Sequence, residues 1–160
     1  MIRAITEVGL AVHDLAAAVE LLSQRLQAVP GPVQHYEPYG MAYCMCRVGN
    51  VDFELMAPLG EGGVIAQFLQ RHGEGLHHIG FAVDDIEATQ RAATAQGLQF
   101  VDSAPRRQRF LLRDFAGNES EGEVKFAFNR PSALLGTVLE FIQYPPGFAL
   151  AATASPSPTA

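Results

Sequence analysis

Residues 76–90, LHHIGFAVDDIEATQ, decide the fold because they repeat a stretch near the start of the chain. Residues 5–19 read ITEVGLAVHDLAAAV and align with them without a gap, at an offset of 71 residues. In each copy a short apolar strand runs into an acidic turn and then into an alanine-rich amphipathic segment. This change of hydrophobic period predicts a strand followed by a helix in both copies. Asp14 and Asp85 stand where the helix N-caps are expected.

A second pair of similar segments closes each copy. Residues 51–59, VDFELMAPL, resemble residues 137–145, TVLEFIQYP, since both place a carboxylate in an apolar strand with a proline four or five residues later. The segments AYCMCRV and EVKFAFN read as further strands, so each half follows the order β-α-β-β-β. A half of about 70 residues would bury too little surface alone. The two halves are therefore expected to pack as one unit.

These patterns predict an α+β fold with one domain over residues 1–146, made of two βαβββ modules packed around a shared cleft. The modules span about residues 1–70 and 71–146. The offset between the closing segments is 86 residues, longer than the first offset. We therefore expect extra loop in the second half, within residues 106–125. Residues 147–160 are mostly Ala, Ser, Thr and Pro and are expected to form a disordered tail.

Composition excludes several classes of protein. The net charge of −6 argues against nucleic acid or an anionic membrane as a partner. No apolar run approaches the roughly 20 residues that span a bilayer, and the first residues do not form a secretory signal. The two cysteines, Cys44 and Cys46, would share one face of a strand in a geometry poor for a disulfide. They read as reduced, buried thiols, which favours a cytoplasmic location.

The repeat places four polar side chains at equivalent positions. Glu7 matches His78 on the opening strands, and Glu54 matches Glu140 on the closing strands. Charged groups on apolar strands must be paired or neutralised. If the strands curve together, the four side chains could hold one divalent ion, and oxygen-rich ligation with one imidazole suits Mn, Mg, Co or Ni and tolerates Zn. The alternative is a structural ion pair. His77 is expected on the opposite face of its strand.

Nearly the whole chain up to about Pro146 resembles the vicinal oxygen chelate superfamily, which includes glyoxalase I, methylmalonyl-CoA epimerases, extradiol dioxygenases and drug-resistance proteins. The stretch FELMAPLGEGGVIAQFLQRHGEGLHHIGFAVDDIEA and the strand LEFIQYP are most similar to the epimerases. The resemblance implies a divalent metal held by Glu7, Glu54, His78 and Glu140, the four positions that the repeat identifies independently. It also implies a homodimer.

The chain departs from the epimerase pattern at two positions. Epimerases have histidine where this chain has Glu7, and a second acid-base glutamate where it has Tyr43. The leading hypothesis is a metal-dependent isomerase or epimerase that removes a proton next to a carbonyl of an acyl-CoA or similar small acid. Glu140 would be the base, and Glu7 and Tyr43 are the other candidate catalytic groups.

Two alternative functions remain open. A glyoxalase I-like lyase would act on the thiol adduct of a 2-oxoaldehyde, and a binding protein of the drug-resistance type would hold a small molecule without turnover. Dioxygenase chemistry fits poorly, because it requires two histidines and one carboxylate at iron. The basic run Arg106, Arg107, Arg109 and Arg113 would lie on a solvated loop or hold phosphates of a CoA-type substrate.

Overall fold

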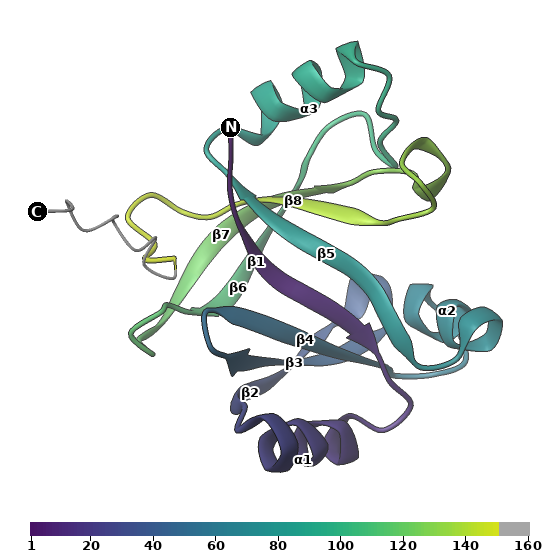
Figure 1. Ribbon diagram of the computed structural model, residues 1–160, viewed down its shortest axis with the longest axis vertical. Coiled ribbons are helices and arrows are strands. Elements are labelled where there is room, and N and C mark those ends of the chain that lie inside the picture. The colour runs from purple at the N-terminus through teal and green to yellow at the C-terminus, as the bar shows by residue number, and fades with distance from the viewer. Residues whose placement is uncertain (151–160) are drawn as a thin grey trace, which may run out of the picture.

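Both copies of the repeat fold into βαβββ modules in the computed structural model, which describes residues 1–150 (Figure 1). The first module contains β1 (Ile2–Ala11), α1 (Leu15–Leu26), β2 (Val29–Tyr36), β3 (Met41–Val48) and β4 (Val51–Pro58). The second contains β5 (Gly75–Val83), α3 (Ile86–Ala95), β6 (Arg106–Arg113), β7 (Glu119–Phe128) and β8 (Leu139–Gln143). Helix α2 (Val64–His72) joins the modules, and 3-10 turns occupy Glu37–Tyr39 and Pro131–Ala133. The predicted α+β fold of two modules is confirmed.

The two repeated helices begin where the sequence places their N-caps. The carboxylate of Asp14 accepts a hydrogen bond from the backbone N–H of Ala17 at 2.9 Å, and that of Asp85 accepts one from Ala88 at 2.8 Å. Each contact satisfies a backbone donor that the first helical turn leaves unpaired. Within residues 1–150, no helix is both long enough and apolar enough to cross a membrane.

The eight strands form one curved sheet in the order β2-β3-β4-β1-β5-β8-β7-β6. The modules meet in the middle, where β1 and β5 pair antiparallel. Helices α1 and α3 cover the outer face of the sheet at its two ends, and the middle strands lie between them (Figure 1). Under α1, the side chains of Cys44 and Cys46 are buried beside Leu55, with their sulfurs 3.7 Å apart as free thiols. The expected buried position of both cysteines is confirmed.

The two edge strands of the sheet, β2 and β6, approach each other through side chains. The Gln34 amide of β2 donates to the carbonyl of Leu111 on β6 at 3.0 Å and accepts from its N–H at 3.3 Å. From the end of β6, the Arg113 guanidinium donates to the carbonyls of Val29 and Pro30 on β2 at 2.8 and 3.1 Å. This seam between β2 and β6 closes the curved sheet into an incomplete barrel, whose inner face carries the four predicted ligands.

The expected extra loop within residues 106–125 is wrong. That segment forms most of a hairpin in which β6 pairs antiparallel with β7, from Arg106 opposite Phe126 to Arg113 opposite Glu119. The extra residues of the second half lie on either side of the hairpin, in residues 96–105 and 129–138, where the first module has two-residue connections. The four arginines of the basic run therefore lie on a strand, so their side chains alternate between two faces.

The predicted tail begins with residues that still pack against the domain. The Phe148 ring stacks on Tyr144 at a centroid distance of 4.9 Å, and the carbonyl of Ala149 accepts a hydrogen bond from the N–H of Phe115 at 3.0 Å. Residues 147–150 thus belong to the packed structure. The remainder of the predicted tail, residues 151–160, lies outside the described residues.

Asn129 fixes the loop that leads into β8. Its side chain is fully buried, donates to the carbonyls of Arg130 and Thr137 at 3.2 and 3.1 Å, and accepts from the N–H of Leu139 at 2.6 Å. Replacing Asn129 by Ala leaves these backbone groups unpaired, so we expect the free energy of unfolding to fall by about 2–4 kcal/mol.

Urea unfolding followed by circular dichroism measures this loss. The matched control is Asn118→Ala, since Asn118 donates its hydrogen bonds to Asp114 in an exposed turn and should change stability by less than about 1 kcal/mol. Equal losses of unfolding free energy in the two variants would show that the buried hydrogen bonds of Asn129 stabilise the fold no more than the exposed ones of Asn118.

Candidate active site

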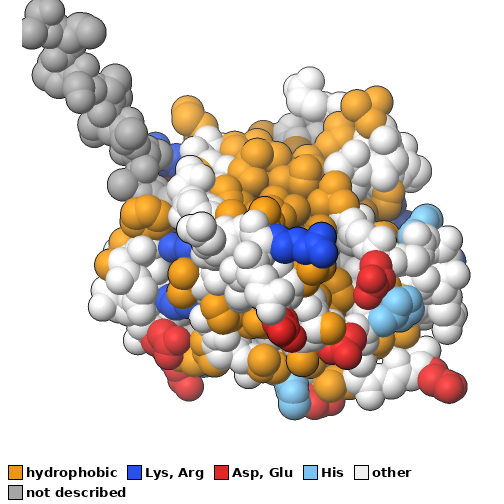
Figure 2. Space-filling view, turned by 60° about the horizontal axis from the view of Figure 1, so that its bottom comes forward, with side chains coloured by type: hydrophobic (Ala, Val, Ile, Leu, Met, Phe, Trp, Pro, Cys, Tyr) orange, Lys and Arg blue, Asp and Glu red, His pale blue; other side chains and the backbone are white. Residues whose placement is uncertain are grey.

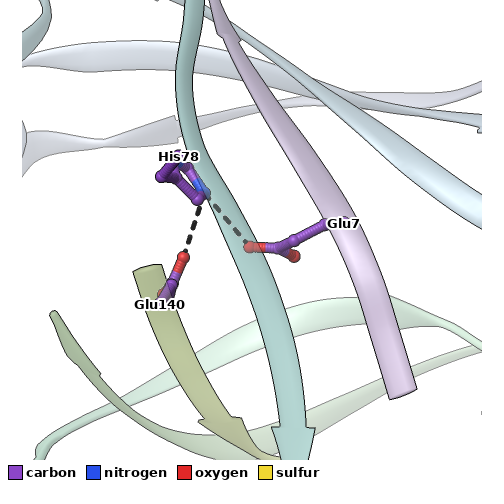
Figure 3. A group of neighbouring side chains, drawn as sticks. All are labelled: Glu7, His78 and Glu140. Atoms are coloured by element: carbon purple, nitrogen blue, oxygen red, sulfur yellow. Dashed lines mark hydrogen bonds and ion pairs between the residues drawn. The ribbon is translucent and has the colours of Figure 1, made fainter. Parts of the chain in front are cut away.

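Four side chains from the four central strands meet on the inner face of the sheet. The Nε2 atom of His78 lies 3.4 Å from a carboxylate oxygen of Glu7, 3.4 Å from one of Glu54 and 3.1 Å from one of Glu140. Figure 3 shows Glu7, from β1, and Glu140, from β8, both directed at the same nitrogen of His78. One ligand atom from each of Glu7, His78 and Glu140 lies within 4.8 Å of the others.

Strand register explains why these side chains converge. In the antiparallel β1–β5 pair, Glu7 stands opposite Gly80 and His78 stands opposite Gly9. In the flanking parallel pairs, Glu54 is aligned with Gly9 and Glu140 with Gly80. Each glycine therefore lies between two ligand positions. The arrangement repeats about the centre of the sheet, as expected for two copies of one module.

The two glycines leave room for the side chains that cross them. A Cβ atom on Gly9 would lie 2.2 Å from Cε1 of His78, and one on Gly80 would lie 2.3 Å from Cγ of Glu7. Distances this short are steric overlaps, so only glycine fits at either position. The matching Gly9 and Gly80 of the repeat thus have a defined structural role: each makes space for the functional side chain on the opposite strand.

The expectation that His77 faces away from the site is wrong. Pairing between β1 and β5 shifts register between Gly9 and Leu10, which face His78 and Leu76, so His77 is an extra residue at a β-bulge. Bulges re-aim neighbouring side chains. Here the Nδ1 atom of His77 lies 3.0 Å from Nδ1 of His78. A hydrogen bond from His78 Nδ1–H to His77 would leave Nε2 of His78 directed toward the carboxylates.

Burial and mutual contacts shift the protonation of the cluster. Burial alone lowers the pKa of His78, but hydrogen bonds to Glu140 and Glu7 outweigh it and hold that pKa well above its ordinary value. Burial, together with the charge of Glu7, raises the pKa of Glu140 well above its ordinary value. Burial first, and then the charge of Glu7, raises the pKa of Glu54 to about 7. Without a cation, the cluster therefore retains protons near neutral pH.

These shifts predict that the metal-free protein loses stability as pH rises. The folded chain keeps a proton on Glu54 between pH 4.5 and about 7, where the unfolded chain releases it. The contribution of this proton to the free energy of unfolding is therefore complete below pH 4.5 and is lost as pH rises through about 7. The raised pKa of His78 acts in the same direction. We expect the melting temperature of chelator-treated protein to fall between pH 5 and 8.

Scanning calorimetry at four pH values tests this expectation. Glu54→Gln should flatten the pH dependence, because glutamine has no proton to lose, whereas Glu61→Gln, in the exposed loop before α2, should leave it unchanged. Identical slopes for the wild type and Glu54→Gln would contradict the assignment of the shift to Glu54.

The cluster lies in a cavity of about 410 Å³ enclosed by the curved sheet. Apolar and aromatic side chains from both modules form much of its lining, among them Tyr36, Tyr39, Met45, Phe110 and Phe126. A pocket of this size, with a few convergent polar groups, is typical of a small-molecule site.

Tyr43 lines the same cavity from β3 and is buried. Burial, and after it the charges of Glu54 and Glu7, raises the pKa of its phenol above the ordinary value of 10. The phenol is therefore neutral at physiological pH. In this state it can donate a hydrogen bond but cannot act as a general base.

The donor set fits a divalent cation. In their ionised forms, three carboxylates within hydrogen-bonding reach of one imidazole would carry more negative charge than that group can balance, and all four residues are largely buried. Buried charges require pairing, and oxygen-rich sets with one imidazole suit Mn²⁺, Co²⁺, Ni²⁺, Mg²⁺ or Zn²⁺. Glu7, His78 and Glu140 form the compact set that could hold the ion, and Glu54, 3.4 Å from the imidazole, stays a predicted fourth ligand.

Sequence reasoning missed the aromatic lining of the cavity, the bulge at His77 and the position of Arg106 at the cavity. The alternation along β6 was the available signal for Arg106, because it directs Arg106 and Phe110 to the same face. No comparable signal marks the bulge.

A curved sheet of two modules around a carboxylate-lined cavity is typical of proteins that bind small molecules, some of which are enzymes. The chain matches the profile of the Glyoxalase/Bleomycin resistance protein/Dioxygenase superfamily over residues 6–116 and belongs to that superfamily. An ethylmalonyl-CoA/methylmalonyl-CoA epimerase of Cereibacter sphaeroides is 35% identical over 104 residues, which cover 64% of this chain and 78% of that protein. The predicted superfamily, with epimerases among the relatives, is confirmed.

Solved structures share the fold over most of the chain. Methylmalonyl-CoA epimerase from Mycobacterium tuberculosis superimposes with a TM-score of 0.76 at 26% identity, over 91% of this chain and 90% of that one. A Streptomyces coelicolor methylmalonyl-CoA epimerase variant in complex with 2-nitronate-propionyl-CoA gives a TM-score of 0.75 at 23% identity, over 89% of this chain and 98% of that one. At that identity the second likeness concerns the fold alone.

Proposed function

We propose that the protein is a metal-dependent epimerase that removes and returns the proton next to the thioester carbonyl of an acyl-CoA or a similar small acid. One observation carries the proposal: three carboxylates from three strands meet one imidazole within 3.4 Å in a cavity of about 410 Å³. The family membership and the epimerase relatives support the same reaction class. A bound divalent cation would supply Lewis-acid stabilisation of the enolate oxygens.

In this proposal, Glu140 and Glu7 act on opposite faces of the substrate. They approach the cluster from β8 and β1, on either side of β5 (Figure 3). The Glu140 carboxylate would accept the α-proton while the C–H electron pair moves into the carbonyl. Glu7 would return a proton to the other face of the same carbon, which inverts its configuration. Tyr43 would donate a hydrogen bond to the substrate from the adjacent wall.

Solvent exchange tests the proposal directly. The protein is stripped of metal, reloaded separately with Mn²⁺, Co²⁺, Ni²⁺ or Zn²⁺, and incubated in D₂O with methylmalonyl-CoA or with a glutathione hemithioacetal. NMR follows loss of the α-hydrogen signal. Metal-dependent exchange on the CoA ester is the expected result.

The other outcomes would replace the proposal. Conversion of the hemithioacetal alone would assign a glyoxalase I-like lyase activity. Bound metal without exchange on either compound would favour a binding protein that holds a small molecule without turnover. Exchange that persists in fully metal-free protein would remove the metal from the mechanism.

We also infer that two copies associate through the outer face of the central strands. Between α1 and α3 this face carries an uncovered apolar strip, and Figure 2 shows hydrophobic side chains gathered in a broad patch on the molecular surface. The most exposed side chains of the strip are Ile2, Ile5 and Leu76, at 50%, 47% and 54% exposure. A second copy that presents the same strip would bury both.

Light scattering coupled to size-exclusion chromatography tests this association. The wild type is expected to elute as a dimer, and the double variant Ile5→Glu with Leu76→Glu as a folded monomer. Val33→Glu, at a 58% exposed apolar position on β2, should remain dimeric. A monomeric wild type would contradict the interface.

A cytoplasmic location is part of the same proposal. The buried free thiols Cys44 and Cys46 support it, because reduced cysteines persist in reducing compartments. Fractionation of cells that express the tagged chain would test the location.

A further inference from the structure

The alternation of β6 separates Arg106 from Arg107 and Arg109, whereas Arg113, at the end of the strand, contacts β2 and lines the cavity. Arg107 and Arg109 lie on the outer face, where Arg107 pairs with Glu87 at 3.3 Å and Arg109 with Glu121 at 3.8 Å. Arg106 instead lines the cavity. Exposed pairs such as those on the outer face contribute little binding specificity.

Two other arginines that line the cavity, Arg47 and Arg113, make hydrogen bonds within the protein. Arg47 makes two hydrogen bonds to the carboxylate of Asp52, at 2.6 and 2.8 Å. Arg113 donates to three backbone carbonyls, those of Val29, Pro30 and Met45. Arg47 is also only 17% exposed, and both Nη atoms of Arg113 are bound to carbonyls.

Arg106 is held in place but keeps an open edge. Its Nε donates to Asp102 at 2.7 Å, its Nη1 donates to the hydroxyl of Tyr39, and its guanidinium carbon lies 5.2 Å from the centre of the Tyr39 ring. Among residues 1–150, no protein acceptor lies within hydrogen-bonding distance of its Nη2 atom. The side chain is 37% exposed. The guanidinium is therefore pre-oriented, with one edge available to an anion.

A wall of aromatic rings separates this open edge from the acidic cluster. Tyr43, whose pKa responds to Glu54 and Glu7, is followed by Phe110 at a centroid distance of 6.4 Å. Tyr36 lies 5.5 Å from Phe110, and Tyr39 lies 4.8 Å from Tyr36. Tyr39, which Arg106 contacts, also lies within the electrostatic reach of Glu140, so a carrier arm whose acyl end lies at the cluster would follow these rings toward Arg106.

We propose that Arg106, positioned by Asp102 and Tyr39, binds a phosphate group of the nucleotide carrier of the substrate, such as coenzyme A, at the rim of the cavity. This inference rests on the proposed function. Guanidinium groups bind phosphate oxygens through charge-assisted hydrogen bonds, and a preformed orientation reduces the entropic cost of binding. The aromatic wall between the rim and the cluster would lie along the apolar part of the carrier arm.

Truncated substrates test which part of the ligand Arg106 contacts. Kinetics are measured for Arg106→Gln with methylmalonyl-CoA and with methylmalonyl-pantetheine, which lacks every phosphate. We expect KM for the CoA ester to rise about tenfold to hundredfold, with kcat little changed. KM for the pantetheine ester should be unaffected. Arg106→Lys should recover part of the loss, and Arg109→Gln is the matched control on the outer face of the same strand.

Calorimetric titration with free coenzyme A separates the inference from the proposed function. Weaker binding of coenzyme A by Arg106→Gln, even if the wild type turns over neither ester, would support the phosphate contact while the proposed epimerase activity failed. Equal losses for both esters would overturn the inference, because the contact would then be to the acyl part or purely structural. Unchanged binding and KM in Arg106→Gln would overturn it as well.

Discussion

Replacing Glu140 by Gln is expected to lower kcat/KM for α-proton exchange by about 10²–10⁴-fold, the usual contribution of a positioned general base. Glutamine keeps the size and one ligand oxygen of the side chain but cannot accept the proton. The raised pKa of Glu140 in the metal-free cluster, caused first by burial and then by Glu7, would fall when a nearby cation favours the carboxylate. The loss should therefore appear mainly in kcat for protein fully loaded with metal.

The experiment compares Glu140→Gln with Glu119→Gln at saturating metal. Glu119 also lines the cavity but lies on β7 outside the cluster, so its variant should keep nearly full activity. Metal content is measured for each protein, which separates a lost ligand from a lost base. Exchange by metal-loaded Glu140→Gln at more than about a tenth of the wild-type rate would exclude Glu140 as the general base.

Adding one methyl group at Gly80 is expected to disable the site without touching a polar atom. The Cβ atom of Gly80→Ala would lie 2.3 Å from Cγ and 2.9 Å from Cδ of Glu7, so Glu7 must leave its position. We expect metal affinity to fall by about tenfold to hundredfold, as when an orienting neighbour of a ligand is lost. The strain should also lower the free energy of unfolding by about 1–3 kcal/mol.

Gly9→Ala is the equivalent variant in the first module, and Gly60→Ala, in a loop, is the control. Gly9→Ala would displace the ring of His78, whose Cε1 lies 2.2 Å from the new Cβ, and should have a similar effect. Gly60→Ala adds the same methyl group where no atom lies within 4 Å, so metal affinity should stay unchanged. Calorimetric titration with Co²⁺ provides the measurement. Wild-type metal affinity in both Gly80→Ala and Gly9→Ala would show that the space left by the two glycines is not required for metal binding.

The sequence was sufficient to predict the modules because the repeat is local and without gaps. Strand and helix periods, the caps at Asp14 and Asp85, and the matching of Glu7 with His78 all follow from residues close together in the chain. The curvature that brings Glu54 and Glu140 to the same imidazole could be expected only if the halves packed together. Their roles as metal ligands stay predictions.

Features that depend on strand pairing could not be read from the sequence. Residues 106–125 contain many charges and resemble a loop, yet they form most of the hairpin of β6 and β7. The bulge that turns His77 toward His78 depends on the register of β1 against β5. Neither the β6–β7 pairing nor the bulge at His77 can be predicted from the hydrophobic pattern of a single segment.

The seam between β2 and β6 makes one wall of the barrel easier to open than the rest. Continuous backbone ladders hold the other neighbouring strands, whereas β2 and β6 meet through Gln34, Arg113, a few backbone partners and the contact of Tyr36 with Phe110. The hydrogen bonds of this edge, at a net value of about 1 kcal/mol each, are fewer than those of a full ladder. Thermal breathing is thus expected first along this line, which would give a bulky ligand a side entrance while the central strands stay rigid.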